Sequence, residues 1–239
     1  MKNHLVSVVV PIRNEEANIE RLAGMIIDAF RNIPSDYEII FVDDGSTDKT
    51  AKIVSYLKNL YDAYRVVLLL NSNKPGKDGA LRTGFGFACG DIVATLDGDC
   101  QNDPADIPAM IGILKQCDMV HGVRVNRKDT FPVRTCSMIA NTMRKMFFQD
   151  PTNDAGCGIN VFRKKCLPIL LKAQFSAAHC FFPAILMFNG FTVREMPVNH
   201  FSRHAGKSKF KLIRGRLTDG ISAGMKMRKM VKYPITSIF

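Results

Sequence analysis

The stretch Ile92-Val93-Ala94-Thr95-Leu96-Asp97-Gly98-Asp99-Cys100-Gln101-Asn102-Asp103-Pro104 decides the fold. Its first five residues form an apolar run typical of a buried strand, and two carboxylates follow where that strand is expected to end. Side chains two positions apart in extended chain point to the same side, so Asp97 and Asp99 can share one target. Gly98 between them lets the backbone approach that target closely.

Oxygen ligands at this spacing suit a hard divalent cation. Mg²⁺ or Mn²⁺ prefers one or two carboxylates together with water and substrate phosphates, and the Gln101 carbonyl could add a third protein oxygen. The alternative is a polar turn that only begins the next helix, because Asp103 and Pro104 are typical of an N-cap and a first helical residue. For an isolated Asp-x-Asp that alternative is the commoner one, so the choice between a metal site and a polar turn depends on motifs elsewhere in the chain.

Strands and helices alternate along the sequence. Asn14 is expected to cap the first helix, which runs to Arg31, with Glu15 and Glu16 in its first turn. Alternation of this kind predicts an α/β fold with a doubly wound, mostly parallel central sheet and helices on both faces. Ligands of such sheets bind beyond the carboxyl ends of the strands. The expected strands are 5–12, 37–42, 65–70, 92–96, 118–123, 159–162 and 191–198, and the expected helices include 79–89, 104–116 and 131–148.

A second acidic turn, beginning at Asp43 and Asp44, is expected at the same edge of the sheet. Beside a metal site, a carboxylate here can accept hydrogen bonds from a nucleobase or a ribose. The alternative is a turn in which Ser46 or Thr47 caps the next helix. His200 and His204 are four residues apart, but no third ligand lies in register, so we expect them to be solvated or to face an anion.

The charge of the chain is unevenly distributed. Residues 1–119 carry 12 Lys/Arg and 17 Asp/Glu, whereas residues 120–239 carry 21 and 5, a net charge of +16. A basic half beside a carboxylate pair indicates anionic substrates bridged by a metal, an anionic membrane surface, or nucleic acid. A nucleic-acid-binding domain is disfavoured because the basic stretches lack interleaved aromatic residues and the aspartates would have no role.

Seven cysteines without a C-x-x-C pair indicate reduced thiols and a cytosolic protein. No window offers the roughly 18 uncharged apolar residues of a spanning helix, so the expected membrane contact is peripheral, on the cytoplasmic face. The sequence suggests a catalytic domain over residues 1–212 and a basic, amphipathic helical segment over residues 213–239.

Taken together, the motifs resemble family 2 glycosyltransferases of the GT-A fold, and most of all their polyprenyl-phosphate branch. The resemblance covers roughly residues 5 to 212. Phe210 stands where the family usually has tyrosine. The motifs are Val10-Pro11-x-x-Asn14-Glu15, Val42-Asp43-Asp44-Gly45-Ser46, Gly90-Asp91, Asp97-x-Asp99-x-Gln101, Gly122-x-Arg124 and Ser202-Arg203-x-x-Gly206-x-Ser208-Lys209-Phe210.

The resemblance implies a role for each motif. Nucleotide binding falls to Pro11, Arg13, Asn14, Glu15, Asp44 and Asp97, and metal binding to Asp97, Asp99 and Gln101. Binding of the diphosphate and the acceptor falls to Arg124, Arg134, Arg203, Ser208 and Lys209, so that Asp97, Asp99, Arg124 and Arg203 are the expected catalytic residues. The implied reaction is metal-dependent transfer, with inversion, of a hexosyl group from GDP-mannose or a UDP-hexose to a dolichyl or undecaprenyl phosphate.

The chemistry of the acceptor distinguishes the two enzymatic alternatives. A phosphate monoester has its second pKa near ~6, so it is already an anionic nucleophile at neutral pH and needs no enzymatic base. The alternative is a family 2 transferase that uses a saccharide hydroxyl, with Asp154 as the base. With a polyprenyl phosphate as acceptor, the enzyme has to reach a membrane, either through its own basic surface or through a membrane-anchor subunit.

Overall fold

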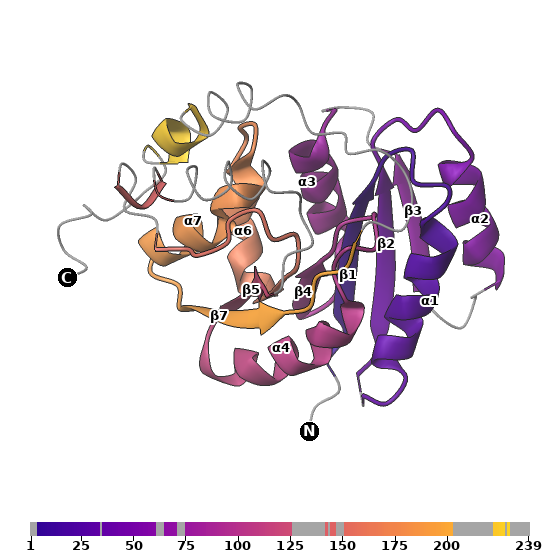
Figure 1. Ribbon diagram of the computed structural model, residues 1–239, viewed down its shortest axis with the longest axis horizontal. Coiled ribbons are helices and arrows are strands. Elements are labelled where there is room, and N and C mark those ends of the chain that lie inside the picture. Colours follow the sequence, from indigo (N-terminus) through magenta and orange to yellow (C-terminus); the bar gives the residue numbers. More distant parts are fainter. Residues whose placement is uncertain are drawn as a thin grey trace.

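The computed structural model describes residues 4–33, 35–60, 65–70, 75–125, 142, 144–146, 151–202, 222–227 and 229. A seven-stranded sheet in the order β3-β2-β1-β4-β6-β5-β7 forms its centre (Figure 1). The strands are β1 (Val6–Ile12), β2 (Tyr37–Asp43), β3 (Arg65–Leu70), β4 (Ile92–Thr95), β5 (Met119–Arg124), β6 (Asn160–Arg163) and β7 (Val193–Val198). All seven expected strands are therefore present, with ends shifted by one or two residues.

Helices cover both faces of the sheet, as predicted. Helices α1 (Ile19–Phe30), α2 (Thr50–Leu60) and α4 (Ile107–Ile113) pack on one face. Helices α3 (Lys77–Phe87), α6 (Leu167–Leu170) and α7 (Phe182–Phe188) pack on the other (Figure 1). Short 3₁₀ turns complete the set: η1 (Pro104–Asp106), η2 (Leu114–Gln116), η3 (Lys164–Cys166) and η4 (Ala178–Phe181).

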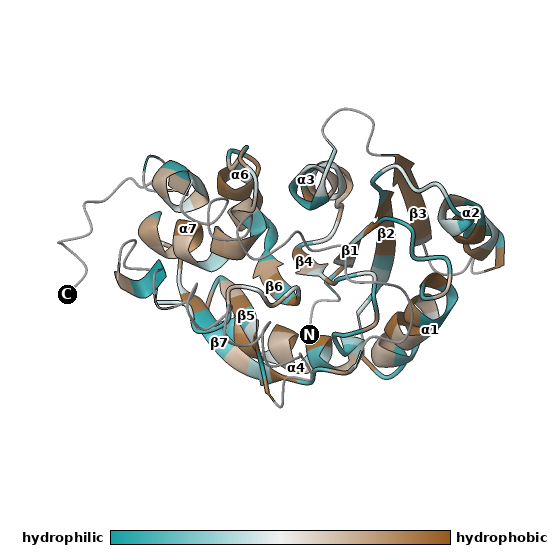
Figure 2. Cartoon of the chain, turned by 45° about the horizontal axis from the view of Figure 1, so that its top comes forward, coloured by the Kyte–Doolittle hydropathy of each residue, from teal (hydrophilic) through white to brown (hydrophobic). Residues whose placement is uncertain are grey.

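Each central strand contributes to two separate cores. Val8 and Val10 of β1 face the core under α1, and Val9 between them faces the core under α3. A strand buried on both sides must be apolar at every position, which explains the unbroken β-branched run of β1. Figure 2 shows the hydrophobic strands β2 and β3 flanked by helices with mixed hydrophobic and hydrophilic faces.

The strand β6 departs from a purely parallel sheet. It runs antiparallel to both β4 and β5, whereas the other neighbouring strands are parallel. The loop that precedes β6 therefore lies at the same edge of the sheet as the carboxyl ends of β4 and β5. This reversal brings residues 154–158 to the acidic turn.

One expectation about the helices was wrong. The helix after β1 begins at Ile19, with Asn18 at its N-cap, and Asn14 lies before it in a left-handed conformation with φ of 48°. Glu15 and Glu16 therefore precede the helix as well. The expected helix 104–116 is present over its whole length, as α4 with the 3₁₀ turns η1 and η2 at its two ends.

Parts of the predicted site and chain lie outside the described residues, namely Arg134, Arg203, His204, Ser208, Lys209 and most of the expected helix 131–148. Of the segment 213–239, the structure describes one helical stretch, 222–227, and Lys229. No helix within the described part of the chain is long and apolar enough to cross a membrane.

Candidate active site

The loops after β1 and β2 are fastened to each other by reciprocal hydrogen bonds. The backbone N–H of Asn14 donates to the Ser46 hydroxyl over 2.9 Å, and the Thr47 N–H donates to Oδ1 of Asn14 over 2.7 Å. The Glu15 N–H donates to the Thr50 hydroxyl over 2.8 Å. Asn14, in its left-handed backbone conformation, thus uses its short polar side chain to bind the neighbouring loop. The segment Pro11 to Glu15 is consequently a fixed wall of the site.

Asp44 links this wall to α3. Its carboxylate is buried, and its two oxygens accept the N–H of Gly76 at 2.7 and 2.9 Å, at the N-terminal end of the helix. Arg13 lies alongside, with Nη1 3.7 Å from Oδ2 of Asp44, and is mostly exposed. The structure therefore brings Arg13, Asn14, Glu15 and Asp44 together, as the sequence predicted for a nucleotide-binding region.

The acidic turn follows β4. Asp97 forms an ion pair with Lys77 of α3, with Nζ 2.5 Å from Oδ1. Burial by itself would raise the pKa of the Asp97 carboxyl, but Lys77, with smaller contributions from His179 and Arg124, holds that pKa below its ordinary value. Asp97 is accordingly an ionised carboxylate in a cationic environment.

Gly158, in the loop before β6, leaves the space that Asp97 occupies. A Cβ atom on Gly158 would lie 2.4 Å from Oδ2 of Asp97, a distance that real Cβ contacts do not show. Side chain and loop therefore fit only because residue 158 is glycine. Within the same turn, Asp99 accepts the N–H of Gln101 over 3.2 Å, and Cys100 between them adopts a φ of 58°.

The chain beyond β7 runs beside the acidic turn. The Phe201 N–H donates to the backbone carbonyl oxygen of Gln101 over 2.9 Å, and the side-chain amide of Gln101 donates to the backbone carbonyl oxygen of Phe201 over 3.4 Å. An isolated bridge joins Asn102 to His200. Of the two expectations for His200, that it is solvated or that it faces an anion, burial at 6% exposure excludes the first. These contacts place His200 and Phe201, where the basic loop begins, beside Gln101, one of the expected metal ligands.

Arg124 and Asp154 form a two-pronged pair at the end of β5. Nε of Arg124 donates to Oδ2 of Asp154 and Nη2 donates to Oδ1, each over 2.7 Å, and the Arg124 backbone N–H also donates to Oδ2 over 3.1 Å. Both side chains are largely buried. Asp154 is therefore occupied in orienting Arg124.

A buried polar network anchors the loop that carries Asp154. His121 of β5 contacts the Asp154 carbonyl oxygen through Nε2 at 2.9 Å and Asn160 through Nδ1 at 2.6 Å. The Asn160 amide donates to Thr95, whose hydroxyl donates to the Gly158 carbonyl. The network spans β4, β5 and β6 and so fixes Asp97 and Arg124 in one frame.

The divalent cation implied by the sequence fits this site in one particular way. Among the residues that the structure describes, no three His, Cys, Asp or Glu side chains converge as metal ligands. The two carboxylates of Asp97 and Asp99 instead match the open type of site, in which Mg²⁺ or Mn²⁺ takes one or two carboxylates and completes its shell with water and phosphate oxygens. One of these carboxylates, that of Asp97, also forms the ion pair with Lys77.

Sequence reasoning missed Lys77, Gly158 and His121. Lys77 follows Pro75-Gly76 at the start of a helix, a signal of an anion-binding N-terminus that was not used. Nothing local in the sequence indicates that Gly158 faces Asp97, because the two residues are 61 positions apart and meet only through the antiparallel pairing of β4 with β6.

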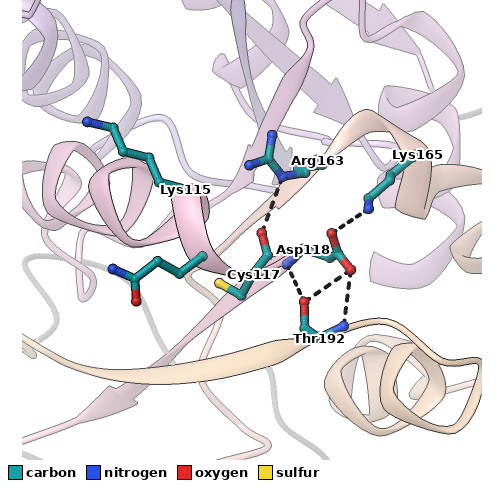
Figure 3. Close-up of a pocket in the computed structure, with 7 residues that line it drawn as sticks. Lys115, Cys117, Asp118, Arg163, Lys165 and Thr192 are labelled. Atoms are coloured by element: carbon teal, nitrogen blue, oxygen red, sulfur yellow. Dashed lines mark hydrogen bonds and ion pairs between the residues drawn. The ribbon is translucent and has the colours of Figure 1, made fainter.

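A hollow at the opposite edge of the sheet is separate from this site. It has a volume of about 420 Å³ and is lined at the starts of β5 and β7 by residues that include Asp118, Arg163 and Lys165 (Figure 3). Asp118 pairs with Lys165 and accepts hydrogen bonds from Thr192, while Arg163 donates to the carbonyl oxygens of Cys117 and Leu114. None of the predicted site residues lines it.

Comparison with known proteins defines the class. The family model described as glycosyl transferase family 2 matches residues 7–171, and the chain belongs to that family. The predicted GT-A fold is confirmed by solved structures. Glucosyl-3-phosphoglycerate synthase from Mycobacterium tuberculosis, in complex with Mn²⁺, UDP and glucosyl-3-phosphoglycerate, superposes with a TM-score of 0.69 at 18% identity, covering 97% of this chain and 81% of that one.

Curated relatives are more similar in sequence. The chain is 33% identical over 216 residues to the undecaprenyl-phosphate 4-deoxy-4-formamido-L-arabinose transferase of Proteus mirabilis (strain HI4320), covering 89% of this chain and 65% of that protein. The protein of that name from Yersinia pestis (strain Pestoides F) is 32% identical over 212 residues, covering 87% and 63%. The chain thus spans slightly less than two thirds of the length of these relatives.

Proposed function

We propose that this chain carries the catalytic domain of a metal-dependent, inverting transferase that moves a sugar from a nucleotide diphosphate donor to a polyprenyl phosphate. The observation that carries the proposal is the position of Asp97. It is an ionised carboxylate at the carboxyl edge of the sheet, between the loops fastened at Asn14 and the Arg124–Asp154 pair, with Lys77 in contact. Relatives named as undecaprenyl-phosphate transferases support the class of acceptor.

The donor nucleotide would lie along the β1 and β2 loops. Asp44 is held by the Gly76 N–H and lies beside Arg13, so its carboxylate would be positioned to accept a hydrogen bond from a base or a ribose. Arg13 is mostly exposed and so can reach a nucleotide. In this proposal Asn14 acts indirectly, because its side chain holds the two loops at the correct separation.

The diphosphate would lie over the acidic turn. A divalent cation held by Asp97 and Asp99, with the Gln101 carbonyl as a third oxygen, would supply positive charge to the departing nucleotide diphosphate. Lys77 and Arg124 face the same carboxylate and can bind phosphate oxygens directly. Together these residues would hold two anions, donor and acceptor, close enough for in-line displacement at the anomeric carbon.

The state of Asp154 favours the phosphate acceptor over a saccharide hydroxyl. Both of its carboxylate oxygens accept hydrogen bonds from Arg124, so taking a proton would weaken an arginine contact that the site needs. A phosphate monoester makes no such demand. Arg134, Arg203, Ser208 and Lys209 remain the proposed acceptor-binding residues.

A donor screen tests the proposal. The chain is incubated with Mg²⁺ or Mn²⁺, a polyprenyl phosphate, and radiolabelled GDP-mannose, UDP-hexoses or nucleotide-activated 4-deoxy-4-formamido-L-arabinose, and the label in the organic phase is counted. We expect one donor to label the lipid, and Asp99→Ala or EDTA to abolish the labelling until metal is restored in the EDTA sample. Labelling that survives chelation would contradict the proposed metal dependence. Labelling of a soluble saccharide in place of lipid would contradict the proposed polyprenyl phosphate acceptor.

A further inference from the structure

Asp78, His179 and Cys180 form a cluster that the proposed reaction does not use. Asp78, one residue after Lys77 in the first turn of α3, accepts three hydrogen bonds from the η4 region. The donors are the Ala177 N–H at 2.7 Å, the His179 N–H at 2.9 Å and Nδ1 of the His179 ring at 2.8 Å. Ala177 holds a left-handed φ of 62°, which is costly for a residue with a side chain. The turn is therefore fixed around the Asp78 carboxylate.

Cys180 completes the cluster. Cys180 directly follows His179 in η4, and its thiol interacts with the imidazole that Asp78 orients. Cys180 is half-buried. A thiol, an imidazole and a carboxylate in this order are the arrangement in which a base activates a nucleophile and a third group orients the base.

Cations from neighbouring elements face the thiol. Lys77 comes from α3, and Arg144, 7% exposed, comes from the helical stretch 144–146, with its guanidinium 4.8 Å from the centroid of the Phe181 ring. Burial opposes ionisation, but His179 first, then Arg144 and Lys77, lower the pKa of the Cys180 thiol. The reverse holds for His179, whose pKa is raised to about 10, against burial, by Cys180 and Asp78.

The other buried thiols provide the contrast. Burial raises the pKa of Cys157 and of Cys166 to about 12 and that of Cys100 to about 11. Such thiols stay protonated at neutral pH and react slowly. Cys89 is exposed, and its thiol donates to the Phe87 carbonyl oxygen. It serves as an accessible thiol without the Asp–His arrangement.

We propose that Cys180 is a covalent modification site, an activated thiol that hydrogen peroxide oxidises and that small electrophiles alkylate. In the oxidation, the thiolate sulfur attacks one peroxide oxygen, an S–O bond forms and the O–O bond breaks. The departing hydroxide takes up a proton to become water. The cysteine loses two electrons to become a sulfenic acid, and the peroxide gains them. Excess dithiothreitol reverses the change through a mixed disulfide.

The modification would act on transfer through Lys77. Lys77 faces both the Cys180 sulfur and the Asp97 carboxylate, so an added oxygen or carbamidomethyl group would disturb the contact between Lys77 and Asp97. This consequence rests on the proposed function. The reactivity of the thiol does not.

Alkylation of the intact chain tests the site without any activity assay. The protein is treated with iodoacetamide at pH 6, and the labelling rate of each cysteine is measured by peptide mass spectrometry. We expect Cys180 to react at least about ten times faster than Cys89, although it is less exposed, because more of it is thiolate. We expect His179→Gln and Asp78→Asn to reduce the rate at Cys180 alone. A faster reaction at Cys89 would overturn the proposal, and so would a Cys180 rate in the wild type that follows pH as an ordinary thiol does.

Peroxide treatment tests the effect on transfer. We expect the wild-type chain to lose organic-phase labelling after treatment and to recover it with dithiothreitol, and Cys180→Ser to keep its labelling. Equal loss of transfer activity in Cys180→Ser would overturn the regulatory role. The modification site itself would still be decided by the alkylation rates. A wild-type chain with no transfer activity before treatment would overturn the proposed function instead, and the alkylation rates would still rank Cys180.

Discussion

The position of the Asp97 carboxylate depends on a glycine, Gly158. Gly158 gives it room, Lys77 pairs with it, and Thr95 in the preceding strand bonds the carbonyl of the same glycine. The orientation of one carboxylate is thus specified by three other positions, of which only Thr95 is near it in sequence.

Gly158→Ala should abolish or strongly reduce transfer, because its Cβ would need the position of the Asp97 carboxylate. The matched control is Gly112→Ala in α4, where an added Cβ meets nothing within 4 Å. We expect that control to keep full activity and to gain about 0.5–1 kcal/mol in unfolding free energy, as alanine does in helices. Chemical unfolding and the organic-phase assay measure both effects. A fully active Gly158→Ala enzyme would show that transfer does not depend on the position of the Asp97 carboxylate.

Asp154→Asn separates an orienting carboxylate from a base. If Asp154 orients Arg124, the variant should lose part of its activity at every pH, and the losses of Asp154→Asn and Arg124→Gln should not add up in the double variant, since the two residues act as a unit. Arg203→Ala should cost more, because a charge-assisted bond to phosphate is lost. Rates across pH 5 to 9 measure this. A folded but dead Asp154→Asn enzyme beside an active Arg203→Ala enzyme would favour a hydroxyl acceptor.

At the scale of elements, Asp78 joins α3 to η4. Burial raises the pKa of its carboxyl, but the hydrogen bond and charge of His179 and two backbone N–H groups lower it further than burial raises it. A carboxyl whose pKa is lower in the folded state stabilises the fold above its unfolded pKa of about 3.9, and this contribution is lost as pH falls through the folded pKa. Asp78 should therefore stabilise the protein at neutral pH and not in acid.

Asp78→Asn should lower the unfolding free energy by roughly 2 kcal/mol at pH 7, because His179 and two N–H groups lose a charged partner. The difference from wild type should shrink below about pH 4. Urea unfolding at a series of pH values measures it. Asp28→Asn is the control, since Asp28 is well exposed and forms its ion pair with Arg31, three residues on at the end of α1. A pH-independent difference would mean that charge is not what Asp78 contributes.

Elements were predictable from the sequence to different degrees. The central strands, such as β1, were correct because a strand buried on both faces must be continuously apolar, and this pattern is local. The direction of β6 was not predictable, since a run of four residues carries no signal of orientation and its partners in β4 lie 65 to 71 positions away. Asn14 was misassigned because its side chain serves a neighbouring loop, and that contact with Thr47 is not local.

At the scale of the whole molecule, the candidate site too could be predicted only in part. Residues at strand ends, such as Asp44, Asp97 and Arg124, could be predicted because the carboxyl edge of a parallel sheet collects them. Lys77, Gly158 and the Asp78–His179–Cys180 cluster come from helix ends and from the loop before the antiparallel strand, and only the packed fold brings them to the same edge.

The uneven charge of the chain predicts how it would reach a lipid substrate. The net charge of +16 over residues 120–239, with the basic stretch 226–232, should give salt-sensitive binding to anionic vesicles. Flotation with phosphatidylglycerol vesicles at low and high salt measures this, and phosphatidylcholine vesicles are the control. If no binding is seen at low salt, another subunit or segment would have to bring the domain to its lipid.

The central claim, that the acceptor phosphate attacks the anomeric carbon without an enzymatic base, is tested most directly by comparing a polyprenyl phosphate with the corresponding polyprenol in one assay across pH. We expect labelled sugar to enter the organic phase only with the phosphate. The rate should be level above pH 7 and fall as pH drops through the second phosphate pKa near ~6. Transfer to the polyprenol, or to an added saccharide in preference to the phosphate, would contradict the account.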